Sequence, residues 1–190
     1  MRFARDSALY DWYGLNDALF LLLNGFHETW FDRFMQAVTS LGHPALYPFY
    51  IALALCWSLA RPASLPLRNV AVFAVAYVSV SVILVPVLKG ALDFPRPAAL
   101  LGGLAVIVGD PDAAQSFPSG HAAFAVALAA SLGAGLGRMT RRVLATFALT
   151  VCVSRVCVGA HFPADVVAGA LLALATVALV QVVMPARAPA

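Results

Sequence analysis

The sequence predicts an all-α, polytopic membrane helical bundle with about five spanning helices. Of the 190 residues, 62% are hydrophobic and only 11% are charged, whereas a soluble domain carries about 25% charged residues. The mean hydropathy of +0.88 and several long apolar runs are typical of membrane proteins. Backbone groups in lipid must be paired within their own segment, so the spanning segments are expected to be helices. The net charge of +3 is small and dispersed, which argues against a nucleic-acid-binding surface.

Residues 1–43 precede the long apolar runs and differ from them. Two segments, 15–26 and 29–41, are amphipathic, with charged side chains between and within them. This pattern is typical of helices that lie at the membrane interface. We interpret residues 1–43 as N-terminal interfacial helices, with a sixth span in this region as the alternative.

The membrane domain is predicted to cover residues 44–184, followed by a short C-terminal tail at 185–190. Some of its five apolar runs are shorter than the ~20 residues that cross the hydrocarbon, and flanking aromatic and small residues should extend them. One run is rich in Ala, Gly and Ser, which let helices approach closely, so we expect this helix to lie among the others. That run is 122–136, and the other four are 45–60, 70–88, 143–158 and 164–183.

The loops divide between two faces of the predicted bundle. One face, with loops 61–68 and 138–142 and the tail, carries six arginines and no acidic residue; the other carries all nine acidic residues and six basic ones. Three of the six basic residues on the second face are candidate site residues. Without them, the first face has six basic residues and the second has three. Short cytoplasmic loops are enriched in Lys and Arg, so the second face is predicted to look to the periplasm or exterior. The predominance of Arg and Ala favours a bacterial source, and hence the cell inner membrane.

Three clusters of polar residues fall on the predicted periplasmic face, and the first and third supply cations. Placing charged residues beside lipid-crossing helices costs free energy, so each is expected to have a structural or functional role. Lys89 ends the second span, and Pro97 keeps Arg96 extended. Arg155 lies one turn inside the end of the fourth span. Three converging cations would suit a dianionic phosphate, since Arg offers a planar fork and Lys a point charge; snorkelling to the membrane surface is the alternative for each cation alone.

A predicted helix start lies between these cations in the sequence. Ser119 is a favoured N-cap, and Gly120 would let a ligand approach the backbone. Free amides at a helix start attract anions. His121 follows and can supply a proton to a leaving alkoxide near neutral pH.

His161 and Asp165 form the last pair on this face. Pro163 suits the first turn of the fifth span, and a spacing of four places the pair on one side of the helix start. Asp165 can accept a hydrogen bond from one ring nitrogen and leave the other as a nucleophile; a polar pair that closes a helix end is the alternative. No carboxylate cluster is available for a metal, so Lys and Arg would neutralise the phosphate, and we expect no metal or cofactor.

Together the three clusters resemble the signature of the type 2 phosphatidic acid phosphatase superfamily. The signature reads Lys, six residues, Arg-Pro; then Pro-Ser-Gly-His; then Ser-Arg, five residues, His, three residues, Asp. The chain matches every part in order and spacing, and the resemblance covers about residues 45–183. The matching residues are Lys89, Arg96, Pro97, Pro118, Ser119, Gly120, His121, Ser154, Arg155, His161 and Asp165.

The resemblance implies a metal-independent phosphatase that works through a phosphohistidine. His161 would be the nucleophile, His121 the general acid and Asp165 the partner of His161. The phosphate would be bound by Lys89, Arg96, Ser119, Gly120 and Arg155.

The substrate implied is a phosphate or diphosphate of a membrane lipid, of the undecaprenyl diphosphate, phosphatidylglycerophosphate or phosphatidic acid type. Soluble acid phosphatases and vanadium haloperoxidases share the site, but the spanning segments favour the membrane lipid phosphatases. One alternative is a lipid phosphotransferase that passes the phosphate to another lipid such as lipid A. Another is a membrane scaffold or transporter that retains the fold. We also expect residues 98–115 to form a flap over the site.

Overall fold

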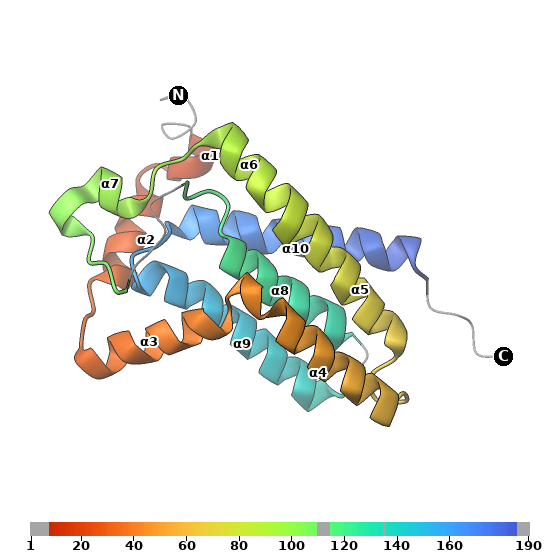
Figure 1. The fold of residues 1–190 in the computed structure, drawn as a ribbon. Coiled ribbons are helices and arrows are strands. Elements are labelled where there is room, and N and C mark those ends of the chain that lie inside the picture. Colours follow the sequence, from red (N-terminus) through yellow and green to blue (C-terminus); the bar gives the residue numbers. More distant parts are fainter. Residues whose placement is uncertain (1–7, 110–114, 135, 186–190) are drawn as a thin grey trace.

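The computed structural model describes residues 8–109, 115–134 and 136–185, and these residues form helices without a strand (Figure 1). The predicted all-α class is therefore confirmed. A π-helical stretch, Val78–Leu84, joins α5 to α6, and it precedes Pro86, which cannot donate a helical hydrogen bond. The α-helices are α1 Ala8–Asp11, α2 Leu15–Asn24, α3 Thr29–Leu41, α4 Tyr47–Ala60, α5 Leu67–Tyr77, α6 Val85–Leu92, α7 Pro97–Leu101, α8 Gly120–Gly133, α9 Arg138–Cys157 and α10 Pro163–Val183, with 3₁₀ turns at Pro44–Leu46 and Gly102–Leu104.

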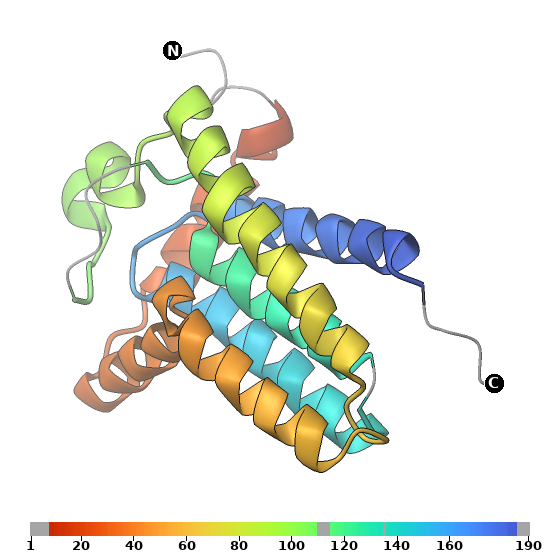
Figure 2. The ribbon, with the colours of Figure 1, turned by 45° about the vertical axis from the view of Figure 1, so that its right-hand side comes forward.

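Helix α8 lies at the centre of the bundle. Figure 2 shows α4, α5, α8 and α9 running side by side, with α10 crossing at an angle, and α8 packs against α5, α9 and α10. Its small side chains, including Ala122, Ala123 and Ala127, are fully buried. They allow the neighbouring helices to approach closely, which confirms the prediction that this helix lies among the others.

The outer surfaces of the surrounding helices are apolar. Leu53, Val87, Leu171 and Val182 are each more than half exposed, as expected for side chains that face lipid rather than water. By length and composition, two helical stretches could cross a membrane, Leu67–Leu104 and Pro163–Val183. The apolar helices α4 and α8 are shorter.

Each of the five predicted runs is helical, although two boundaries differ from the prediction. Helix α9 begins at Arg138, so the expected loop 138–142 forms its first turns. Long arginine side chains can reach water from a helix end, and the sequence pattern therefore could not separate loop from helix. Helix α8 ends at Gly133 rather than at residue 136, where a glycine disfavours further helix.

The N-terminal region forms α1, α2 and α3, and the predicted helical segments 15–26 and 29–41 agree with the last two. Helix α2 packs against α9 and α10, and α3 packs against α9 (Figure 1). The predicted tail at 185–190 lies outside the described residues except for Pro185.

Candidate functional site

The predicted pair of His161 and Asp165 meets at the start of α10. Pro163 occupies the first turn of this helix, as predicted. Oδ2 of Asp165 accepts a hydrogen bond from the backbone N–H of Phe162 at 2.9 Å and lies 3.4 Å from Nδ1 of His161. The exposed fractions are 2% for His161 and 0% for Asp165. The carboxylate therefore holds the Nδ1 side of the ring and leaves Nε2 for chemistry.

Two further residues, which the sequence did not single out, form hydrogen bonds with this pair. The Ser116 hydroxyl donates to Oδ2 of Asp165 and lies 3.2 Å from Nδ1 of His161. The Tyr10 hydroxyl donates to Oδ1 of Asp165 at 2.8 Å. Ser116 lies just before the Pro-Ser-Gly-His motif and Tyr10 lies far from any motif, so no spacing pattern marks either residue. The carboxylate is thus held by donors from the N-terminal region, the loop before α8 and α10.

The electrostatic surroundings keep the His161 ring neutral at physiological pH. Its pKa is lowered to about 4, first by burial and then by the charges of Arg155 and Arg96, while the hydrogen bond and the charge of Asp165 oppose this shift. A neutral imidazole has an unprotonated nitrogen, which a nucleophile requires.

Two of the predicted cations converge on the histidines. Arg155, in the last turn of α9, is 7% exposed, and its Nη1 donates to Oγ1 of Thr39 at 2.6 Å. Nη1 of Arg96 donates to the carbonyl oxygen of Ala160 at 2.9 Å, directly before His161. Both guanidinium charges act electrostatically on the two imidazoles. Arg96 is extended between helices, as its neighbour Pro97 predicts.

Lys89 lies at the edge of this cluster. Its Nζ donates to the carbonyl oxygen of Gln115 at 2.7 Å, one residue before Ser116. The structure therefore places Lys89 beside the loop that leads into α8. Among the described residues, no group of three or more His, Cys, Asp or Glu side chains could hold a metal ion.

The start of α8 presents an unsatisfied hydroxyl. Ser119 is the N-cap residue, as predicted, but its side chain makes no capping bond. The hydroxyl is buried, and within the described residues it has no hydrogen-bond partner. A buried polar group without a partner is costly, so this hydroxyl is suited to a ligand. Gly169 lets α10 pack against this point, because a Cβ there would lie 2.4 Å from the Ser119 carbonyl oxygen.

His121, in the first turn of α8, opens onto a polar pocket of about 200 Å³. The His43 ring meets it edge to face, with 4.9 Å between ring centroids. The sequence did not single out His43, which lies between the N-terminal helices and α4. The pocket is lined by Gln36, Thr39, Ser40, His43, Val108, Gly109, His121, Arg155, Val158 and Ala160.

Helix α2 braces the segment that carries His161. Oδ1 of Asn16 accepts the backbone N–H of Ala164 at 2.9 Å. Nδ2 of Asn24 donates to the carbonyl oxygens of Cys157 at 2.9 Å and Val106 at 2.8 Å. Both asparagines are 1% exposed. Polar residues inside an apolar helix were the available sequence signal for this structural role.

The expected flap over the site is described only in part. Val108 and Gly109 line the polar pocket, which agrees with a segment beside the site. Leu100 and Leu101 pack against a buried apolar cluster that includes Phe20 and Phe162. Residues 110–114 lie outside the described part of the chain.

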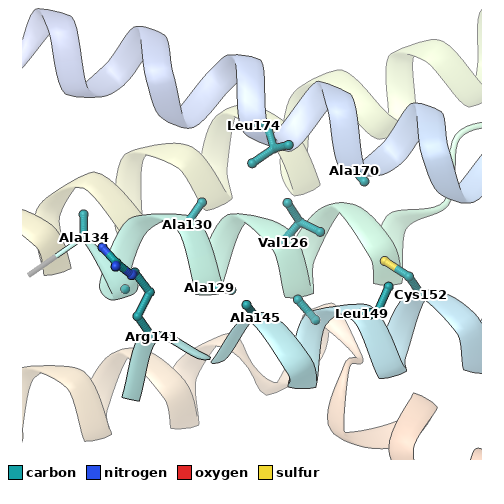
Figure 3. Close-up of a pocket in the computed structure, with 12 residues that line it drawn as sticks. Val126, Ala129, Ala130, Ala134, Arg141, Ala145, Leu149, Cys152, Ala170 and Leu174 are labelled. Carbon is teal, nitrogen blue, oxygen red and sulfur yellow. The ribbon is translucent and has the colours of Figure 1, made fainter. Parts of the chain in front are cut away.

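A separate hollow of about 460 Å³ lies between α8, α9 and α10 (Figure 3). Small and aliphatic side chains line it, with Arg141 toward one end and Cys152 toward the other. Its lining includes no histidine or carboxylate, so it offers no acid–base pair. The polar pocket beside His121 is the candidate site.

The family model of the PAP2 superfamily matches residues 69–189. The chain belongs to the PAP2 superfamily. This confirms the resemblance to the type 2 phosphatidic acid phosphatases, and every residue of the signature lies within the match. Helices α1 to α4, with Tyr10 and Gln36, lie outside it, as does His43 between α3 and α4.

Two solved PAP2 structures share the fold. LpxE of Aquifex aeolicus is 28% identical, with a TM-score of 0.76 over 88% of this chain and 94% of that chain. The first transmembrane PAP2-type phosphatidylglycerolphosphate phosphatase from Bacillus subtilis is 25% identical, with a TM-score of 0.71 over 95% of this chain and 88% of that chain. No curated protein matches the sequence. The chain thus has the fold of membrane PAP2 phosphatases.

Proposed function

We propose that the chain is an integral membrane phosphatase that hydrolyses a lipid phosphate or diphosphate through a phosphohistidine on His161. The observation that carries this proposal is the buried His161–Asp165 pair, with two arginines acting on the same ring. A neutral imidazole fixed by a carboxylate is a nucleophile, and fixed cations stabilise the charge of a transferring phosphoryl group.

In the first step, Nε2 of His161 attacks phosphorus, and the bond from phosphorus to the leaving oxygen breaks. His121 donates its proton to that oxygen, and the bound dianion favours the protonated form of His121 beforehand. Lys89, Arg96 and Arg155 bind the phosphoryl oxygens, together with the Ser119 hydroxyl and the Gly120 amide.

In the second step, water replaces the histidine. His121, now neutral, accepts a proton from the attacking water, whose oxygen bonds to phosphorus as the bond to Nε2 breaks. Inorganic phosphate leaves and His161 is restored. The link between His161 and Asp165 orients the ring in both steps.

The same proposal places five helical segments across the bacterial inner membrane: α4, α5 to α6, α8, α9 and α10. Residues 1–43 would lie at the interface and the site would face the periplasm. Apolar outer surfaces support the placement, and the predicted asymmetry of arginine between loops supports the orientation. A similar structure bears the name of a phosphatidylglycerolphosphate phosphatase, which supports phosphatidylglycerophosphate among the candidate substrates.

Phosphate release from purified protein tests this function. We expect inorganic phosphate from at least one of phosphatidylglycerophosphate, phosphatidic acid and undecaprenyl diphosphate, with full activity in EDTA, because arginines and lysine supply the positive charge. Vanadate should inhibit, since it imitates five-coordinate phosphorus. Loss of activity in EDTA with recovery on adding magnesium would contradict the mechanism. Phosphate transfer to a second lipid without release would identify a phosphotransferase.

Cysteine labelling tests the orientation. In a chain without Cys56, Cys152 and Cys157, a cysteine at Gly102 should react with an impermeant thiol reagent in intact cells whose outer membrane is permeabilised. A cysteine at Thr140, in the first turn of α9, should react only after lysis. The reverse pattern would place the site in the cytoplasm.

A further inference from the structure

The polar pocket lies where the leaving group must emerge. His161 attacks phosphorus from one side, and in-line displacement sends the leaving oxygen to the opposite side. Under the proposed function His121 protonates that oxygen, so the alcohol extends from phosphorus toward His121. His121 and Arg155 both line the pocket, whereas His161 does not. The pocket is therefore the space available to the part of the alcohol nearest the phosphate.

The part of the pocket lining formed by Gln36, Ser40 and His43 both donates and accepts hydrogen bonds. The Ser40 hydroxyl already donates to the Gln36 carbonyl oxygen at 2.8 Å, so its oxygen remains as an acceptor. Nδ1 of His43 accepts from the backbone N–H of Ala45 at 3.0 Å, so the neutral ring carries its proton on Nε2, as a donor. The Gln36 side chain offers one donor group and one acceptor.

Gly109 makes room for the Gln36 amide. Its φ is +87°, and a Cβ at this position would lie 2.9 Å from Nε2 of Gln36. A larger residue would therefore push this amide away. The glycine and the glutamine together shape one side of the pocket.

This combination of groups matches hydroxyls. A second phosphate has only acceptor oxygens and favours cations, but Arg155 is the one Lys or Arg among the described lining residues. A hydrocarbon chain would remove water from these polar groups and offer no hydrogen bond in its place. A hydroxyl both donates and accepts, and can pair with each of them.

We infer that the wall formed by Gln36, Ser40 and His43 binds hydroxyl groups of the leaving alcohol, so the substrate is a phosphate ester of a polyol headgroup such as a glycerol or a sugar. The inference rests on the proposed function and narrows it. The wall belongs to α3 and the segment that follows it, outside residues 69–189 that match the family, so it can differ between members that share the signature.

A pair of lipids that differ in one hydroxyl tests the inference. The first is phosphatidylglycerophosphate, whose headgroup carries a free hydroxyl beside the phosphorylated carbon. The second is its analogue with 1,3-propanediol in place of the headgroup glycerol, which lacks that hydroxyl. The kcat/KM of the unmodified chain should be about tenfold higher for the first, since a hydrogen bond at a partly exposed site contributes modestly. Phosphatidic acid and undecaprenyl diphosphate should be poorer substrates than the first.

Gln36→Leu should bring the ratio of the two kcat/KM values close to one, and its yield and elution profile in detergent report intact folding. Arg33→Leu, an apolar substitution on the same helix outside the pocket lining, should leave the ratio unchanged. A ratio near one in the unmodified chain, or a ratio that Gln36→Leu does not alter, would overturn the inference while phosphate release still supports the phosphatase. If none of these lipids releases phosphate, the proposed function and this inference both fail.

Discussion

His161→Ala should abolish phosphate release and any covalent phosphate on the protein. His121→Ala should keep some activity, and the amount should depend on the substrate. The nucleophile is needed for every substrate, because the phosphoryl group must bond to Nε2 before it reaches water. Loss of the general acid should cost about 10²–10⁴-fold on lipid esters, whose alkoxide leaves poorly without a proton. The cost should shrink on a nitrophenyl phosphate, since nitrophenolate departs unprotonated.

The comparison requires equal folding and insertion, so the yield and elution profile of each variant in detergent are measured beside kcat and KM. Rescue of His161→Ala rather than His121→Ala by the nitrophenyl substrate would show that the two roles are exchanged. Rescue of neither would show that His121 does not protonate the leaving group.

Much of the fold and most of the site could be predicted because the responsible signals are local. Apolar runs located the five helical segments, and proline positions placed Arg96 and His161 beside helix starts. The family match then confirmed that the chain belongs to the superfamily. The spacing alone predicts that His161 lies near Asp165, since side chains four positions apart at a helix start lie close together.

The remainder depends on contacts between distant segments. Tyr10 reaches Asp165 across 155 positions in the sequence, and Thr39 reaches Arg155 across 116. Neither residue belongs to a motif, and a tyrosine or a threonine in a helix does not by itself indicate a functional role. The N-terminal helices were interpreted as interfacial because of their amphipathic pattern. The same pattern also provides polar side chains that pack beside the site and hydrogen-bond to it. Only the packing of α2 and α3 against α9 shows this.

The hydrogen bonds around Asp165 predict a graded series of variants. Asp165→Asn should lower kcat by roughly 10²–10⁴-fold, because it removes the negative charge and alters the tautomer that the ring adopts. Ser116→Ala should lower kcat by roughly 10- to 100-fold, as expected when a hydrogen bond to a charged group is lost in the transition state. Its hydroxyl lies closer to Nδ1 of His161, at 3.2 Å, than Oδ2 of Asp165 does, at 3.4 Å, so it links the carboxylate to the ring.

Tyr10→Phe is the matched control for this series. It removes a hydroxyl hydrogen bond to the same carboxylate, but at Oδ1, away from His161. We expect kcat to change by less than about threefold, since the orientation of the ring is retained, although the melting temperature should fall. Because the defect of Ser116→Ala lies in the nucleophile, KM should stay constant, phosphohistidine formation should slow, and the nitrophenyl substrate should give no rescue. Equal losses of kcat in Tyr10→Phe and Ser116→Ala would instead show that both hydroxyls only stabilise the fold around Asp165.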